Sequence, residues 1–421
     1  MPTISYAQLA AAGVPGGATA LSLVTELAPA GGPHAGVAPA RYVVGRDTPT
    51  FGYETRFIDG QPAVAVIIDQ KQSQLNRVEA AVLQSIRDEH PLLSRVPRVQ
   101  VCYDGGRVAY TDLELPQRVF DGHILAGTVD GVPVAAHPGY RAVRDSSPAD
   151  ARAVLELSPG SLVLGAFDST RKTRPGRYRS ALVGEIIGVL ADQDGGFPRE
   201  SKRGGARVDP VGASITLTGD ELNKIMAGQQ QELSPDLIKK IEDAARRRGE
   251  TTDSSALVGL GFTPPALQGP GVVSCSRIIR TQVLSFAALR QLRFDSGPAG
   301  DAACRALLAA YALAGLARAN AELVVRANCD LVEAGPTVVK LDARNGAFIA
   351  LDPPSIEEAD ELLERALEEA KREADIDWRG QVFQITGDPA IYAAAGEPDG
   401  VHPAPAPRPF WRPYLVAGRS H

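Results

Sequence analysis

Five cationic side chains lie close together near the middle of the chain. They are Arg171, Lys172, Arg174, Arg177 and Arg179. No acidic residue stands between Asp168 and Glu185 to balance them. Cations at this density repel one another unless an anion lies among them, and guanidinium groups bind phosphate through charge-assisted hydrogen bonds. Tyr178, within the same run, offers a ring on which a nucleobase could stack. The run predicts a polyanion site; a solvated loop with a few surface ion pairs is the alternative.

A second group of polar residues opens a predicted helix. Residues 69–79 read Asp-Gln-Lys-Gln-Ser-Gln-Leu-Asn-Arg-Val-Glu. On a helix, four of them would lie away from the apolar stripe: Gln72, Ser73, Asn76 and Arg77. Amide, hydroxyl and guanidinium groups beside a helix N-terminus suit phosphate, sugar and base edges. The structural alternative makes Asp69 the N-cap, with Gln72 as its capping-box partner.

Three further polar segments are weaker candidates. Ser169 adjoins the basic run, and Arg277 ends a Ser-Cys-Ser-Arg segment at a predicted strand, where one polar side chain could face a ligand. Arg326 and Asp330 stand where a long helix is expected to end. That pair is most simply structural.

Strand and helix patterns that could position these residues alternate along the chain. Strands are predicted at residues 20–27, 63–68, 98–103, 107–113, 123–134, 161–167, 271–279 and 337–341. Helices are predicted at residues 72–90, 178–191, 217–248 in two pieces, 286–292, from 301, and after 354. Asp104-Gly-Gly and Asp130-Gly predict two hairpins. Residues 195–210 are expected to form a loop, and the last forty or so residues a Pro/Gly-rich tail.

The charge balance does not exclude a polyanion. The 421 residues carry a formal net charge of −6, which by itself argues against nucleic acid. Residues 355–375 alone hold nine carboxylates and three cations, so this one predicted helix accounts for the whole excess. The rest of the chain is neutral overall and is compatible with a local basic groove.

The sequence shows no catalytic or metal-binding pattern. The four cysteines are scattered, the six histidines show no metal spacing, and the phosphate-loop, zincin and serine-elbow motifs do not occur. We therefore predict no catalytic residues, no metal and no cofactor. The first residues lack a basic leader pattern and no apolar stretch reaches membrane-span length free of charges, so a cytoplasmic protein without membrane contact is expected.

Several ordered blocks resemble one known family. Residues 69–79 resemble its Asp-Ser-x-Gln-Ser-x-x-Asn-Arg-x-Glu block, with Gln70 in the usual place of serine. Residues 161–169 resemble its Ser-Leu-x-x-Gly-x-Phe-Asp-Ser strand, and residues 179–188 its Arg-Ala-Leu-x-x-Glu-Ile helix. The family is the RAMP-superfamily backbone subunit of type I-G (formerly I-U) CRISPR Cascade effector complexes. Two later segments, residues 276–277 and 326–331, extend the resemblance, which covers about residues 18–350.

The resemblance implies a fold and a division of the chain. The fold is α+β: a ferredoxin-like, RNA-recognition-type RAMP palm with inserted helical and hairpin elements forming a finger or thumb. Residues 1–194 would form the first part of the palm, 195–270 an inserted loop and helical segment, and 271–350 the second part with a long buried helix. Residues 351–421 would hold the acidic helix and the C-terminal tail.

The resemblance also implies a function and partners. Such subunits are non-catalytic, polymerise with other copies along a CRISPR RNA guide, join other effector subunits, and present the guide for pairing with target DNA in antiviral defence. The helix start and the basic loop would be two sides of one RNA groove. The residues carried over to RNA binding are Gln72, Ser73, Asn76, Arg77, Ser169, Arg171, Lys172, Arg174, Arg177, Tyr178, Arg179 and Arg277.

Two other functions remain open at the level of sequence. One is a metal-dependent RAMP ribonuclease in which Asp69 or Asp168 positions a hydrated cation, although aspartates at strand ends are more often caps. The other is an oligomeric scaffold that associates through its acidic helix and binds a small anionic metabolite in the basic loop.

Overall fold

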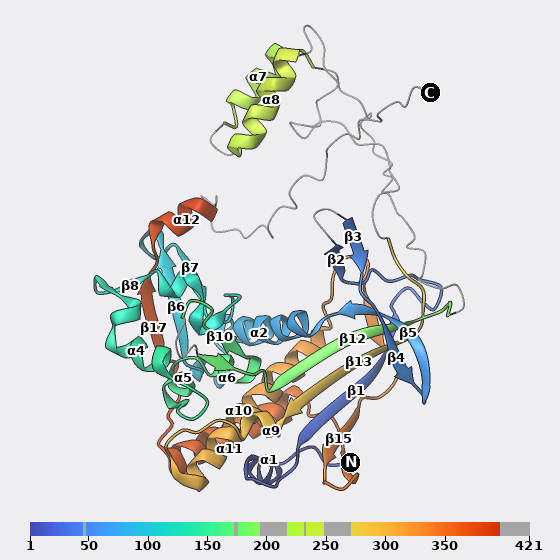
Figure 1. Ribbon diagram of the computed structural model, residues 1–421, viewed down its shortest axis with the longest axis vertical. Helices are drawn as coiled ribbons and strands as arrows, with labels where there is room; N and C mark the ends of the chain where they lie inside the picture. Colours follow the sequence, from blue (N-terminus) through green and yellow to red (C-terminus); the bar gives the residue numbers. More distant parts are fainter. Residues whose placement is uncertain (45–47, 172–175, 194–216, 231–232, 248–270, 396–421) are drawn as a thin grey trace. The chain divides into compact units, whose positions relative to one another are not determined.

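The computed structural model describes residues 1–44, 48–171, 176–193, 217–230, 233–247 and 271–395 (Figure 1). The chain divides into two compact units. One comprises Met1–Arg199 and Val272–His421, and the other Glu200–Gly271. The predicted loop at 195–210 and the tail beyond residue 395 lie outside the described residues.

The first unit is built on an eight-stranded antiparallel sheet. Its strands, in spatial order, are β16 (Phe348–Leu351), β15 (Val338–Asp342), β1 (Ala20–Pro29), β13 (Cys275–Ser285), β12 (Leu182–Leu190), β5 (Gln61–Asp69) and β4 (Tyr53–Ile58), with β14 (Leu331–Glu333) also paired to β1. Burial alternates along β1, where Leu21, Leu23 and Leu27 are buried and Glu26 between them is exposed. One face of the sheet therefore carries the core.

The centre of this unit has the ferredoxin-like arrangement. In chain order it runs β1, α2 (Lys71–Arg87), β12, β13, α10 (Gly297–Glu322) and β15, a βαββαβ sequence. In the sheet these four strands have the order β15-β1-β13-β12. Strand β1 therefore lies between β15, the fourth of the set in chain order, and β13, the third, as in RNA-recognition modules. Leu75 and Val78 of α2 share one core with the alanines of α10. The predicted α+β fold is confirmed.

Two long helices follow from simple sequence signals. Pro298 opens α10, and 89% of its most apolar window is buried; it is the one helix in the described part of the chain long and apolar enough to cross a membrane. Ser355 and Glu358 form a capping box that starts the acidic helix α11 (Ile356–Ala374). The apolar side of α11 packs on α10, so its carboxylates lie mainly toward solvent.

A second, five-stranded sheet joins distant parts of the chain. Its order is β7 (Val108–Thr111), β6 (Arg98–Tyr103), β17 (Val382–Thr386), β8 (Thr128–Val129) and β9 (Val132–Pro133). The β6–β7 and β8–β9 hairpins are confirmed at the two predicted Asp-Gly turns. Strand β17 pairs parallel to β6 across nearly three hundred residues, which no local pattern indicated.

The remaining described elements are short. In the first unit they are α1 (Tyr6–Gly13), β2 (Arg41–Val44), β3 (Thr48–Phe51), α3 (Gly122–Leu125), α4 (Pro138–Asp145), α5 (Arg152–Leu157), α6 (Pro159–Leu164), β10 (Ala166–Phe167), β11 (Arg177–Tyr178), α9 (Phe286–Leu289), α12 (Pro389–Ala395) and four 3₁₀ turns: η1 (Leu93–Arg95), η2 (Asp104–Gly106), η3 (Arg118–Phe120) and η4 (Val134–Ala136). In the second unit α7 (Gly219–Ala227) and α8 (Pro235–Arg247) confirm the two predicted helical pieces.

Two predicted strands before the basic loop are only partly confirmed, because strand residues occur at 166–167 and at 128–129 and 132–133 while each run begins as a helix. The apolar run 161–167 was expected to form one buried strand, but Pro159 starts the helix α6 and Gly165 ends it at φ 87°. A Cβ at Gly165 would also meet Ser180 Oγ at 2.6 Å. Similarly, residues 123–134 open with a short helix because Asp121 accepts a hydrogen bond from the His123 N–H.

The predicted helix at 178–191 is wrong. Residues 182–190 form β12, near the middle of the large sheet. Their Leu-Val-Gly-Glu-Ile-Ile-Gly-Val-Leu sequence is rich in β-branched residues, which favour a pleated surface. Gly188 permits the close approach of β13, since a Cβ there would meet Cys275 Sγ at 2.4 Å. The resemblance to a family helix in this block therefore carried the wrong secondary structure.

Candidate nucleic-acid interface

Asp69 is the centre of a polar cluster at the end of β5. Its carboxylate is buried and accepts hydrogen bonds from Ser73 Oγ at 2.9 Å and Gln74 Nε2 at 2.6 Å. Arg77 donates to both of its oxygens at 3.0 Å, and Arg326 Nη2 donates at 2.5 Å. We call Asp69, Ser73, Gln74, Arg77 and Arg326 the Asp69 cluster.

The cluster differs from the sequence-based interpretations of Asp69 as a helix cap and of Arg326 as the partner of Asp330. Gln70, rather than Asp69, holds the N-cap position of α2, and no side chain caps the helix. The expected pairing of Arg326 with Asp330 is wrong, because the carboxylate that Arg326 contacts belongs to Asp69. Asp69 therefore ties the start of α2 to the segment that follows α10.

The cations of the cluster keep Asp69 ionised. Burial by itself would raise the pKa of this carboxyl group. The hydrogen bonds from Arg77, Gln74 and Ser73 outweigh burial and hold the pKa below its ordinary value. One buried negative charge thus fixes the positions of two guanidinium groups.

Both guanidinium groups remain partly in solvent. The side chains of Arg77 and Arg326 are 22% and 28% exposed. Beside them on the first turns of α2, Lys71, Gln72 and Asn76 are exposed. With one carboxylate against two arginines, the cluster carries a net positive charge toward this surface.

The basic loop is closed at its base by backbone and side-chain contacts. The Asp168 N–H donates to the Gly176 carbonyl at 2.9 Å, just after the β10 strand. The buried Asp168 carboxylate accepts from the N–H and Oγ1 of Thr170, and its other oxygen lies 3.7 Å from Arg144 Nε. Ser169 is exposed and donates to Gln117 Oε1.

The described arginines of this loop have different surroundings. Arg171 pairs with Asp145 at 3.0 Å, so the expectation that no acid lies near is wrong for this residue: the acid comes from α4. Arg177 is exposed, with its guanidinium 5.4 Å from the centre of the Phe167 ring. Arg179 is also exposed, and within the described residues neither it nor Arg177 forms an ion pair. Lys172 and Arg174 lie outside the described residues.

Tyr178 does not offer its ring to solvent. It is 4% exposed, stacks on Phe120 at 6.4 Å between ring centres, and shares a hydrogen bond with Ser146. The interpretation of this ring as a platform for a base is therefore wrong. The alternation of a short strand explains it, because Arg177 and Tyr178 point to opposite sides of β11.

A residue that the sequence did not single out connects the two blocks. Arg118, in the 3₁₀ turn η3, donates to Glu79 Oε1 on α2 at 2.5 Å and to the Gly165 carbonyl at 2.8 Å. Its neighbour Gln117 accepts from Ser169. Turn η3 thus links α2 to the base of the basic loop. A lone arginine in a turn gives no sequence signal, although its φ of 51° marks an unusual backbone position.

Arg277 lies apart from both blocks, on β13. It pairs with Glu26 and with Asp59, the latter at 2.7 Å. Two carboxylates surround this one guanidinium, so its surroundings are net negative. Of the candidate residues described, Arg277 has the least favourable setting for a phosphate.

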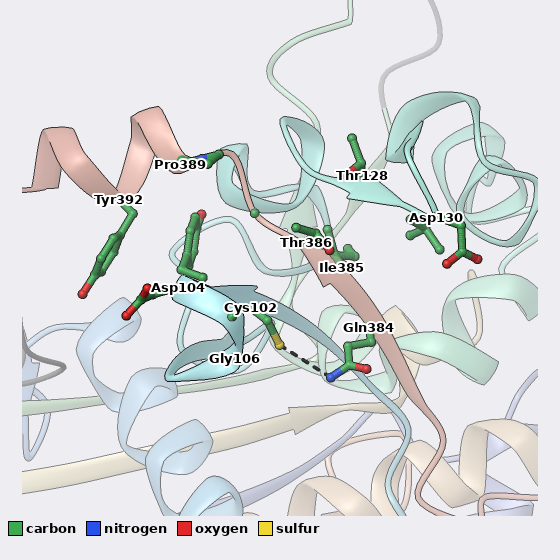
Figure 2. Close-up of a pocket in the computed structure, with 14 residues that line it drawn as sticks. Cys102, Asp104, Gly106, Thr128, Asp130, Gln384, Ile385, Thr386, Pro389 and Tyr392 are labelled. Carbon is green, nitrogen blue, oxygen red and sulfur yellow. Dashed lines mark hydrogen bonds between the residues drawn. The ribbon is translucent and has the colours of Figure 1, made fainter.

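A separate hollow of about 800 Å³ lies beside the second sheet (Figure 2). It is bordered by β6, β17 and α12, with Asp104, Asp130 and Tyr392 around it. Figure 2 shows Gln384 reaching toward Cys102, whose Sγ is 3.6 Å from the amide nitrogen. None of the predicted RNA-binding residues that the structure describes borders this hollow.

Comparison with known families gives one result. Residues 21–193 match the family model described as CRISPR-associated protein GSU0053 (Cas_GSU0053). The match indicates a CRISPR-associated protein family. It points to a role in CRISPR defence and to involvement with CRISPR effector machinery. No curated protein matches the chain. The matched residues, 21–193, include Asp69, the start of α2, η3 and the basic loop.

Proposed function

We propose that this chain is a RAMP-superfamily backbone subunit of a type I-G Cascade that binds CRISPR RNA along the Asp69 cluster and the basic loop. It polymerises with other copies along the guide in the cytoplasm, joins other effector subunits, and presents the guide to target DNA. The observation that carries this proposal is the Asp69 cluster: a buried carboxylate fixes two partly exposed guanidinium groups, and residues 21–193, which include Asp69 and Arg77, match a CRISPR-associated family model.

Such an arrangement suits a repeated, sequence-independent ligand. Guanidinium groups donate to phosphate oxygens, and fixing them in advance reduces the side-chain entropy lost on binding. The exposed amides of Gln72 and Asn76 are suited to sugar and phosphate contacts. Base pairing can then read the target, while this protein holds the guide by shape and charge.

The basic loop extends the same surface. Arg118 and Gln117 connect α2 to the base of the loop, where the exposed Arg177 and Arg179 form no ion pair among the described residues. An unpaired, exposed arginine contributes charge to an incoming polyanion without first losing a carboxylate partner. Arg177 and Arg179 are therefore the strongest candidates for direct phosphate contact.

The surroundings of the two candidate acids favour a non-catalytic role over a metal-dependent ribonuclease. Asp69 accepts from two arginines, an amide and a hydroxyl, so a cation approaching it would meet positive charge. Asp168 is buried and faces Arg144. Incubation of the purified protein with labelled RNA and Mg²⁺ or Mn²⁺ tests this: cleavage that is lost in Asp168→Ala would favour the nuclease.

The binding experiment compares matched pairs of substitutions. Arg177→Gln with Arg179→Gln removes two cations from the interface, whereas Arg107→Gln with Arg365→Gln removes two exposed cations elsewhere. RNA affinity is measured at several salt concentrations. Loss of two phosphate contacts lowers the slope of log affinity against log salt by about 1.4, for every RNA sequence alike.

The outcomes separate the alternatives. A reduced slope only in the interface pair supports guide binding at this surface. An equal change in both pairs, or none in either, contradicts the site. If protein expressed with its guide RNA elutes free of nucleic acid at low salt, the scaffold that binds a small anionic metabolite is favoured instead.

A further inference from the structure

The hollow beside the second sheet lies at the carboxyl ends of two parallel strands (Figure 2). Strand β6 ends at Tyr103 and β17 ends at Thr386, and residues at and just after both ends line the hollow. In open sheets with parallel strands, ligands often bind outside the carboxyl ends of the strands. The volume of about 800 Å³ is within the range of small-molecule sites in proteins.

An aromatic stack fixes one wall of the hollow. Tyr103 is 3% exposed, and its hydroxyl oxygen lies 2.7 Å from His123 Nδ1. The Tyr103 ring stacks on Tyr392 of α12, with 5.5 Å between the ring centres. Gly387 permits this packing, because a Cβ there would meet the Tyr103 ring at 2.3 Å. Helix α12 is therefore held against the end of the sheet.

Two of the residues that line the hollow are charged at neutral pH, and both are carboxylates. Asp104 directly follows β6 and Asp130 directly follows β8, and Figure 2 shows them on opposite sides of the hollow. Strand β17 lies between β6 and β8 in the sheet. Neighbouring strands are about 4.8 Å apart, so two strand spacings separate the two turns by roughly 10 Å.

Both carboxylates are available to a ligand. Asp130 is exposed, and its side chain forms no ion pair or hydrogen bond with any residue that the structure describes. Asp104 pairs with Arg107 at 3.4 Å, but the two side chains are 52% and 83% exposed. An ion pair this exposed contributes little, so Arg107 does not prevent a second cation from approaching Asp104.

The surface between the two carboxylates is uncharged. Gln384 and Thr386 point to the same face of β17 and form the floor, and Val129 and Pro389 add apolar surface. Methylene groups can lie on such a floor. An anion would instead face two negative charges, with no cation among the described residues that line the hollow. A linear molecule with a positive charge at each end matches this arrangement.

We infer that this hollow binds a linear diamine, whose two ammonium groups pair with Asp104 and Asp130 while its methylene chain lies across β17. The site is separate from the proposed RNA surface, because no candidate RNA-binding residue that the structure describes borders it. The inference therefore does not depend on whether the chain binds a guide.

The experiment uses the full chain at low salt and two probes with the same alkyl chain, 1,8-diaminooctane and octylamine, with binding followed by ligand-observed NMR titration. The wild-type protein is expected to bind the diamine about threefold more tightly, since one further exposed ion pair is worth roughly that factor. The double variant Asp104→Asn/Asp130→Asn removes this preference, and each single variant lowers it. The matched control is Glu361→Gln/Glu364→Gln, which neutralises two exposed carboxylates of α11 and leaves the preference unchanged.

The substitutions are chosen to preserve the fold. Asp104 and Asp130 have φ values of 46° and 50°, and asparagine adopts this left-handed conformation as readily as aspartate. Equal affinities for the two probes in the wild type, a preference that persists in the double variant, or an equal loss in the α11 control would each overturn the inference. Absence of diamine binding would overturn it as well. Should the double variant not fold, the two single variants decide.

Discussion

Two buried charges in this protein have opposite surroundings. Asp69, at the end of β5, is fully buried and accepts from Ser73, Gln74, Arg77 and Arg326. Arg280, two strands away in the same sheet, is equally buried but leaves two nitrogens without partners. A satisfied charge acts as a scaffold, since it fixes the groups around it. An unsatisfied buried charge does the opposite, because each unpaired donor lowers the stability of the fold around it.

The same distinction separates candidate residues that looked alike in the sequence. Arg77 and Arg277 each follow a polar residue, Asn76 and Ser276, and both were candidate RNA-binding residues. Arg77 shares one carboxylate with a second arginine, so positive charge remains; Arg277 is surrounded by two carboxylates. The positive charge of an arginine therefore predicts a phosphate contact only when its ion-pair partners in the folded protein are known.

The largest expected effect is on stability, at Asp69. Asp69→Asn leaves two arginines beside a neutral amide, and removing one member of a buried ion pair costs about 3–5 kcal/mol. Ser73→Ala is the matched control, because it removes one neutral donor worth about 1 kcal/mol. Urea unfolding measures both. Similar losses for the two variants would mean that Asp69 does not organise the cluster.

Asp112 extends the comparison with Asp69 to the pH dependence of stability. It is buried like Asp69 but accepts only from neutral donors, the Val99 N–H and Ser158 Oγ. Burial raises its pKa from 3.8 to about 6. Between these values the folded state binds more protons than the unfolded state, so stability falls as pH rises from about 4 to about 6.

Between pH 4 and pH 6 the free energy of unfolding is expected to fall by about 3 kcal/mol because of Asp112. Asp112→Asn does not titrate, and its unfolding free energy should fall by that much less over the same range. Asp69 behaves in the opposite sense: its pKa is held low, so its contribution is present above the ordinary carboxyl pKa and is lost as pH falls below it. If the unfolding free energies of wild type and Asp112→Asn depended on pH in the same way, the raised pKa of Asp112 would be contradicted.

The smallest expected effect is at Arg280. Arg280→Met removes a buried cation with unpaired donors, so the unfolding free energy is expected to stay within about 1 kcal/mol of wild type or to rise. Asp69→Asn is the comparison, measured in the same urea series. A loss at Arg280 as large as that at Asp69 would mean that the guanidinium already has the partners it needs.

The sequence predicted the fold where patterns are local. Strand β5 and helix α2 follow from apolar alternation and helical spacing, and the hairpin β6–β7 follows from Asp104-Gly-Gly. The secondary-structure prediction was wrong at residues 178–191, because a run of apolar residues interrupted by glycines fits a central strand as well as a helix. It also missed β17, whose pairing with β6 depends on residues far apart in the chain.

The sequence predicted which residue types form the candidate site, but not how those residues contact one another. The sequence singled out Arg77 and the basic loop, but not that Asp69 joins Arg77 to Arg326, nor that Arg118 links α2 to Gly165. These contacts connect residues tens to hundreds of positions apart. Burial of Tyr178 was likewise decided by tertiary packing on Phe120.

A reconstruction of this chain bound to its guide RNA tests the central claim most directly. We expect phosphates of the guide at the guanidinium groups of Arg177 and Arg179, with the RNA backbone continuing past Arg77 and Arg326. Passage of the RNA across another surface, with these four arginines away from any phosphate, would contradict it.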